Sequence, residues 1–475
     1  MKLICIVAFL FLLSACGRNA SPTYACDLPL VVSSTPIPTH TPSQSALIPT
    51  PTPTPFLDPL PIERTISYEP EYIPIIPRWI EGEALLVEHF LCDFDYLMHT
   101  LRHNFPLFGP AYRRHGLNIE SIEALTRQAI ITSNPTDPHS FSMILAQNFF
   151  NHFGGFGHLY QHWEARLHLV LANIYRDSID ENGDFIHMYS QRIYEVMRAP
   201  AATRFYGNIS VDIGQYEHNR INPNNLSTKI IEEDKIAYVN VRLFNHYNID
   251  HDRDIMMAFY DEIRDFDHLI IDLQQNPGGF TNYFYELFVM PNLVSPLKGR
   301  MLEFFPASRN NLVYADALIG DMLVSDPFSV TVHYNAADFA RENNMPYFNE
   351  DDLAMLHNVI EWHIKIDPIN YTRAFNGKIW VLIGPMSESG VEAVAIFVKE
   401  TGFATLVGQP TAGIMGAISA YKLLPNSGIL VRYDLGYMTD SYGRSFEEFG
   451  VHPHYFSPIG GCALETVLAL IEAAQ

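Results

Sequence analysis

The sequence predicts an α/β fold with a parallel sheet, preceded by a helical N-terminal region. Short apolar strand patterns occupy residues 236–241, 268–273, 378–383 and 404–407. Helical patterns at 255–263 and 391–400 separate them. Strands that alternate with helices favour a parallel sheet with crossover helices.

The N-terminus has the pattern of an export signal. Lys2 precedes an apolar run at 3–13, which is too short to span a bilayer. The run ends in Leu13-Ser14-Ala15-Cys16-Gly17, which resembles a bacterial lipobox. We therefore expect residues 1–16 to be a lipoprotein signal, with Cys16 acylated and the chain anchored outside a bacterial cell membrane. Cleavage nearby to give a soluble secreted protein is the alternative.

Residues 17–61 are predicted to be a tether. The run Pro49-Thr50-Pro51-Thr52-Pro53-Thr54-Pro55 excludes helix and central strand, because proline lacks the amide donor and fixes φ. Extended polyproline II at about 3.1 Å per residue is expected instead.

Residues 62–207 are predicted to form a helical domain. An apolar stripe at helical spacing ends before Pro106, and a second helical pattern covers 141–150. The glycines of Gly154-Gly155-Phe156-Gly157-His158 then stop the helix and place His158 on a turn. The core is expected over 208–475, where 304–369 looks irregular apart from a helix at 353–364.

Charge and cysteine usage exclude several classes. Lys+Arg number 30 against 53 Asp+Glu, a formal charge of −23 without a basic cluster, so nucleic acid is not an expected partner. Cys26, Cys92 and Cys462 are too few for a disulfide framework or metal site, although a Cys92–Cys462 bridge is possible. His99 and His103 stand at i, i+4 but lack the intervening Glu of a metalloprotease, and we expect no metal or other cofactor.

Two turns lie where a parallel sheet binds ligands, at the carboxyl ends of strands. Gly278 and Gly279 follow the strand at 268–273 and could present N–H groups as an oxyanion hole, or could form an ordinary tight turn. Ser387 and Ser389 precede the helix at 391–400, where serine either caps the helix or meets its positive dipole end as a nucleophile.

Taken in order, these turns resemble the C-terminal processing peptidases and the tricorn core. Ser389 and Glu392 keep the family spacing of nucleophile and glutamate. The stretches 402–413, 424–428 and 447–453 resemble later family motifs. The resemblance implies a crotonase-like core and hydrolysis of polypeptides through an acyl-enzyme. It also implies an oxyanion hole from the N–H groups of Gly390 and of Gly278 or Gly279.

The chain departs from the Ser–Lys dyad of the processing peptidases. Ile414 stands where the family lysine would be, and neither Lys399 nor Lys422 matches its spacing. The tricorn-like branch instead implies His158 as the base and Glu447 as its supporting carboxylate, with Gly157 replacing a serine.

Two alternatives stay open. A catalytically inactive peptide- or ligand-binding lipoprotein on the same scaffold would explain the missing lysine. An acyl-CoA enzyme is compatible with the core fold, but export disfavours it because CoA is intracellular. The sequence does not predict an oligomeric state.

Overall fold

The computed structural model describes residues 83–163, 185, 187–207, 221–306, 317, 328–416 and 418–474. The predicted signal, the lipid site at Cys16 and the tether lie outside these ranges, as does part of the predicted helical domain at 62–207. Within the described ranges, no helix combines the length and apolarity needed to cross a bilayer.

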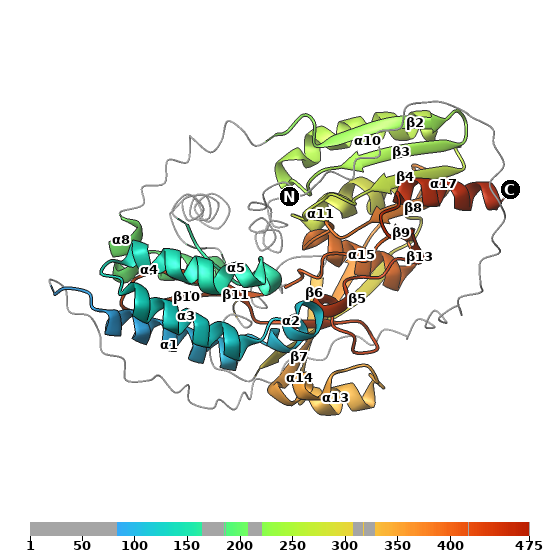
Figure 1. Ribbon diagram of the computed structural model, residues 1–475. Helices are drawn as coiled ribbons and strands as arrows, with labels where there is room; N and C mark the ends of the chain where they lie inside the picture. Colours follow the sequence, from blue (N-terminus) through green and yellow to red (C-terminus); the bar gives the residue numbers. More distant parts are fainter. Residues whose placement is uncertain are drawn as a thin grey trace.

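A six-stranded sheet forms the centre of the core, in the order β13-β9-β8-β4-β3-β2 (Figure 1). Its five strands from β13 to β3 are parallel, as predicted, and the edge strand β2 is antiparallel to β3. The bounds are β2 (Leu226–Glu232), β3 (Ile236–Val241), β4 (His268–Asp272), β8 (Lys378–Ile383), β9 (Thr405–Gly408) and β13 (Tyr455–Phe456).

Helices cover both faces of this sheet. The crossover helices α10 (Ile249–Ile263) and α15 (Gly390–Thr401) share one apolar core with α11 (Thr281–Phe284), and a π-turn at Tyr285–Val289 extends α11. The C-terminal helix α17 (Ala463–Ala473) packs against β8 and β9 through a separate apolar cluster. The strand–helix–strand prediction is confirmed.

A second, antiparallel sheet has the order β12-β5-β7-β6. The expectation of an irregular segment at 304–369 was wrong, and the expected helix at 353–364 ends at Met355. The side chains of Ile360, Trp362, Ile364 and Ile366 are buried at every second position, a period that favours strand. The bounds are β5 (Leu297–Pro306), β6 (Phe328–Tyr334), α13 (Ala336–Glu342), α14 (Glu350–Met355), β7 (Leu356–Ile366) and β12 (Tyr437–Thr439).

The N-terminal helices cover a third sheet, β1-β11-β10, and share an apolar core with it (Figure 1). Strand β1 pairs with β11, so the helical region is joined to a hairpin far along the chain. Cys92 is a free thiol, and a Cys92–Cys462 bridge is therefore not formed. The bounds are α1 (Val87–Asn104), α3 (Ile119–Ser133), α4 (Pro138–Leu145), α5 (Asn151–Phe153), β1 (Tyr160–Gln161), α7 (Met188–Met197), α8 (Pro200–Tyr206), β10 (Ser419–Leu423) and β11 (Leu430–Asp434), with a π-turn at Ala146–Phe150.

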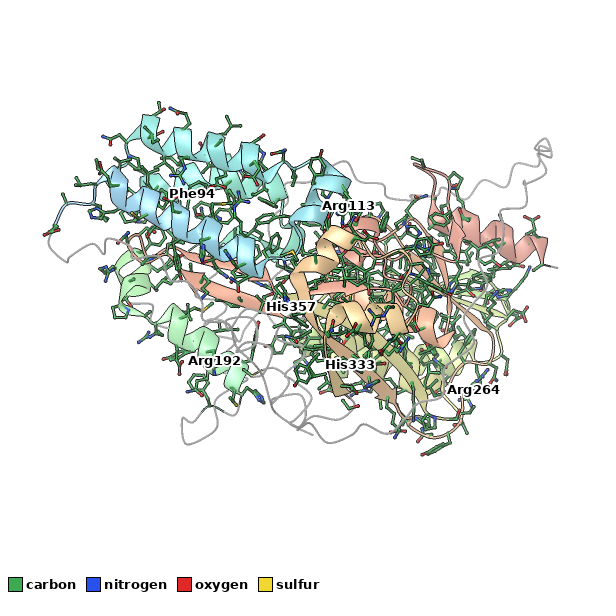
Figure 2. The ribbon with its side chains drawn as sticks, turned by 90° about the horizontal axis from the view of Figure 1, so that it is seen from below. Phe94, Arg113, Arg192, Arg264, His333 and His357 are labelled. Carbon is green, nitrogen blue, oxygen red and sulfur yellow. The ribbon has the colours of Figure 1, made fainter. Side chains whose placement is uncertain are left out.

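Helix α2 (Phe108–His115) belongs to the helical region and packs against elements from the rest of the chain. In Figure 2, Arg113 of this helix lies between the N-terminal helices and the rest of the fold. Its guanidinium forms ion pairs with Asp352 of α14 and with Glu448 of α16 (Phe446–Phe449). These contacts fix α2 against α16, which carries Glu447.

Candidate active site

Ser389 occupies a strained turn between β8 and α15. Its backbone has φ 54° and ψ −114°, and its side chain is fully buried. A positive φ is rare for a residue other than glycine, and such strain is often found at functional sites. The Ser389 side chain forms no N-cap hydrogen bond, so the capping interpretation does not apply to it.

The two serines of this turn differ in what their hydroxyls do. Ser387 Oγ accepts a hydrogen bond from the Gly384 N–H at 3.0 Å and donates to the Leu273 carbonyl at 2.8 Å. By contrast, Ser389 Oγ forms no hydrogen bond with any residue that the structure describes. Ser387 therefore holds the turn to β4, whereas the Ser389 hydroxyl is available for chemistry.

The glycine turn after β4 lies directly against Ser389. A methyl group added at Gly278 would lie 2.8 Å from both Ser389 Cβ and the Gly390 nitrogen, and one added at Gly390 would collide with the Gly279 carbonyl. The Gly278 N–H already donates to the Asn276 side chain at 2.9 Å. No hydrogen bond from the N–H of Gly279 or Gly390 is found among the described residues. Gly279 and Gly390 are thus the better pair of oxyanion donors.

His158 ends a short 3₁₀ turn after α5, as predicted, and is also buried. Its φ of 46° again lies in the left-handed region. Its Nδ1 lies 2.7 Å from Oδ2 of Asp434, the last residue of β11. The preceding Gly157 admits no side chain, because a methyl group there would lie 2.6 Å from the Phe105 ring. This crowding favours glycine at position 157.

Asp434 was not identified from the sequence. Besides the His158 ring, its carboxylate accepts a hydrogen bond from Ser419 Oγ at 2.6 Å. Burial would raise the pKa of Asp434, but His158 and the buried Arg432 outweigh this and hold the pKa below its ordinary value. An ionised carboxylate therefore faces Nδ1, and it favours the tautomer that leaves Nε2 as a proton acceptor.

Glu447 lies on α16, also buried, but the structure does not pair it with His158. Its Oε2 accepts a hydrogen bond from Ser445 Oγ at 3.2 Å, whereas Asp434 takes the bond to the His158 ring. Burial raises the pKa of Glu447 well above its ordinary value, and the charges of Glu392 and Asp434 raise it further. Asp434, rather than the predicted Glu447, is therefore the carboxylate that contacts the His158 ring.

The loop 411–416 connects the serine to the His158–Asp434 pair. The Ile414 carbonyl accepts the Ser389 N–H at 3.0 Å, and a methyl group at Gly416 would collide with the Asp434 carboxylate. Ile414 and Gly416 are two residues apart, so their Cα atoms are at most about 7 Å apart. The serine turn and the Asp434 carboxylate are therefore close neighbours, although Ser389 Oγ forms no hydrogen bond with His158.

Neither candidate lysine supplies the family base. Lys399 lies ten positions after Ser389, about 15 Å along α15, and donates to the His452 carbonyl. Lys422 lies within β10, opposite Val431. Among the described residues, no group of three or more His, Cys, Asp or Glu side chains has metal-binding geometry.

Several solved structures are similar to this chain at low sequence identity. A putative peptidase from Parabacteroides merdae is 13% identical, with a TM-score of 0.45 over 80% of this chain and 95% of that chain. Mature CPAF complexed with lactacystin is 14% identical, with a TM-score of 0.44 over 78% and 94%. A lipoprotein from Streptococcus agalactiae is 10% identical, with a TM-score of 0.39 over 84% and 99%. No curated protein matches the chain in sequence.

The family comparison covers the core. Residues 235–456 match the model of peptidase family S41, and this range holds Ser389, Gly279, Gly390 and Asp434. His158 lies before the matched range. The core of the chain, residues 235–456, is thus similar to peptidase family S41.

Proposed function

We propose that the chain is a serine endopeptidase in which Ser389 is the nucleophile and His158 the base. The observation that carries this proposal is the Ser389 hydroxyl itself. It is buried, forms no hydrogen bond with a described residue, and lies on a strained turn against Gly279 and Gly390. A serine with a purely structural role would use its hydroxyl as Ser387 does.

The reaction would proceed in two steps. Ser389 Oγ attacks the peptide carbonyl while His158 Nε2 takes the hydroxyl proton, and the N–H groups of Gly279 and Gly390 stabilise the oxyanion. His158 then gives the proton to the leaving amine, which leaves an acyl-enzyme. Water, deprotonated by the same histidine, hydrolyses the ester and restores Ser389. Asp434 supports the imidazolium that forms in both steps.

Covalent labelling tests this proposal. The wild-type protein is expected to react with a fluorophosphonate at one site, and His158→Ala is expected to slow labelling by about 10²–10⁴-fold, the usual contribution of a general base. The label would be located by mass spectrometry of the intact protein and its peptides. Absence of labelling in protein with native circular dichroism would contradict the proposal.

An inactive binding protein is the second candidate function. Two observations favour it: Ile414 replaces the family lysine, and Ser389 Oγ forms no hydrogen bond with His158. Catalytic hydrogen bonds often tighten only when substrate binds, so the second observation is also compatible with an active enzyme. Peptide binding without labelling is the result that would favour this candidate.

We further propose that the chain is an exported lipoprotein anchored through Cys16. The support is the sequence of residues 1–17, with its lysine, short apolar run and lipobox-like end. Expressed in a bacterium with a lipoprotein export pathway, the full chain is expected to partition into the detergent phase. Cys16→Ser should move it to the aqueous phase. Equal partitioning of the two proteins would contradict the anchor.

A further inference from the structure

Arg114 lies beneath the loop that connects Ser389 to Asp434, although it belongs to helix α2 of the N-terminal region. Its Nη1 donates to the Glu447 carbonyl at 2.6 Å. A methyl group at Gly413 would collide with the same nitrogen, so the guanidinium touches the Gly413 backbone. The guanidinium therefore spans α16 and the loop 411–416.

Glu392 holds the same point of the loop. Its two carboxylate oxygens accept the N–H groups of Gly413 at 2.5 Å and of Ile414 at 2.8 Å. Because the Ile414 carbonyl accepts the Ser389 N–H, Glu392 fixes the segment that fixes the serine. Gly413 is thus held by a cation and a carboxylate.

The charges around Arg114 explain why a guanidinium is needed here. Glu392, Glu447 and Glu448 all interact electrostatically with it. Glu448 is already bonded to Arg113, which also pairs with Asp352. The pKa of Glu392 is raised to about 7, chiefly by burial and also by the charge of Glu388, against hydrogen bonds from Thr411, Gly413 and Ile414 that lower it. The Arg114 cation interacts with Glu392 and favours its ionised form. Burial lowers the pKa of Arg114, but a guanidinium stays charged in proteins.

We infer that Arg114 is a positioning residue for the reaction at Ser389. It clamps the loop 411–416 to α16 and favours the ionised Glu392 that holds Gly413 and Ile414. The N-terminal region would then contribute two residues to the site: His158 as the base, and Arg114 as the cation under the loop 411–416. This inference rests on the proposed hydrolase function, and its test needs one measurement that does not depend on activity.

The test compares Arg114→Met with Arg114→Lys in the full chain. Arg114→Met is expected to slow fluorophosphonate labelling at pH 7 by about 10- to 100-fold, because the loop 411–416 shifts and Ser389 shifts with it. It should also move the acidic limb of the labelling rate upward by about one pH unit, because Glu392 then ionises at higher pH. Arg114→Lys keeps the charge and should restore the pH limb, with part of the rate. Hydrogen exchange of peptides that cover 411–416 should be faster in Arg114→Met.

Arg113→Met is the matched control. It removes a cation from the same helix turn, one that contacts Asp352 and Glu448 but not Gly413. It should lower thermal stability while leaving the pH limb and the exchange of 411–416 unchanged. If Arg114→Met behaves in the same way, the inference is overturned while the hydrolase stands. If the wild type is not labelled, the proposed function fails, and the exchange measurement alone supports or overturns the clamp.

Discussion

Replacing Ser389 with alanine is expected to abolish fluorophosphonate labelling and peptide hydrolysis without unfolding the protein. Removal of a serine nucleophile from a comparable catalytic unit lowers kcat by on the order of 10⁶-fold. The structural cost should be small, because Ser389 Oγ forms no hydrogen bond within the described part of the chain. Alanine also meets the same backbone strain at φ 54° as serine does. Labelling kinetics, peptide hydrolysis and thermal melting together measure the outcome.

Ser387→Ala provides the control from the same turn. It deletes a buried hydroxyl that bonds to the Gly384 N–H and the Leu273 carbonyl, so the unfolding free energy should fall by about 1–3 kcal/mol. Labelling of the folded protein should persist. A labelled Ser389→Ala protein, or loss of labelling only in folded Ser387→Ala, would place the nucleophile elsewhere.

The sequence was sufficient for the elements whose pattern is local. The parallel strands β3, β4, β8 and β9 and the helix α15 are each encoded by a short apolar run bounded by turn residues. The turns at Gly278-Gly279 and Ser389-Gly390 could be predicted to meet because the carboxyl ends of parallel strands share one edge of a sheet. The structure brings them into contact.

The strand β7 shows where local pattern was ambiguous. Its first residues continue directly from helix α14, and the segment 353–364 has apolar side chains at both helical and alternating spacings. Pairing with β5 on one side and β6 on the other decides for strand, because each interstrand neighbour supplies main-chain hydrogen bonds. A short sequence window around β7 does not include the partner strands β5 and β6.

Asp434 could not be found for a related reason. It is 276 residues from His158, and only the hairpin β10–β11 packing beneath the N-terminal helices brings the two together. A signal was present, since Arg432 and Asp434 place two charged residues in a short strand whose other residues are apolar or aromatic. Glu447 was preferred because it matches a family motif. A motif does not indicate which of two neighbouring carboxylates contacts the histidine.

Asp434→Asn is therefore the second change with a large expected effect. An asparagine amide at this position can donate to His158 Nδ1, which would leave the proton on Nε2 and remove the base. A substitution of this kind in a Ser–His–Asp triad lowers kcat by about 10⁴-fold, and we expect a loss of 10³–10⁴-fold in labelling and hydrolysis. The same change leaves the buried Arg432 without its nearby negative charge, so stability should also fall. Rates must be compared at a temperature where near-UV circular dichroism shows native packing.

Glu447→Gln separates the two candidate carboxylates. Glu447 is buried, and its raised pKa shows that the ionised form is disfavoured there. A neutral glutamine should therefore keep or improve stability, with less than about a tenfold loss of activity if Asp434 is the group that orients His158. If Glu447→Gln instead costs as much activity as Asp434→Asn, the base depends on Glu447 through a rearrangement on substrate binding. In that case the His158–Asp434 hydrogen bond at 2.7 Å is structural rather than catalytic.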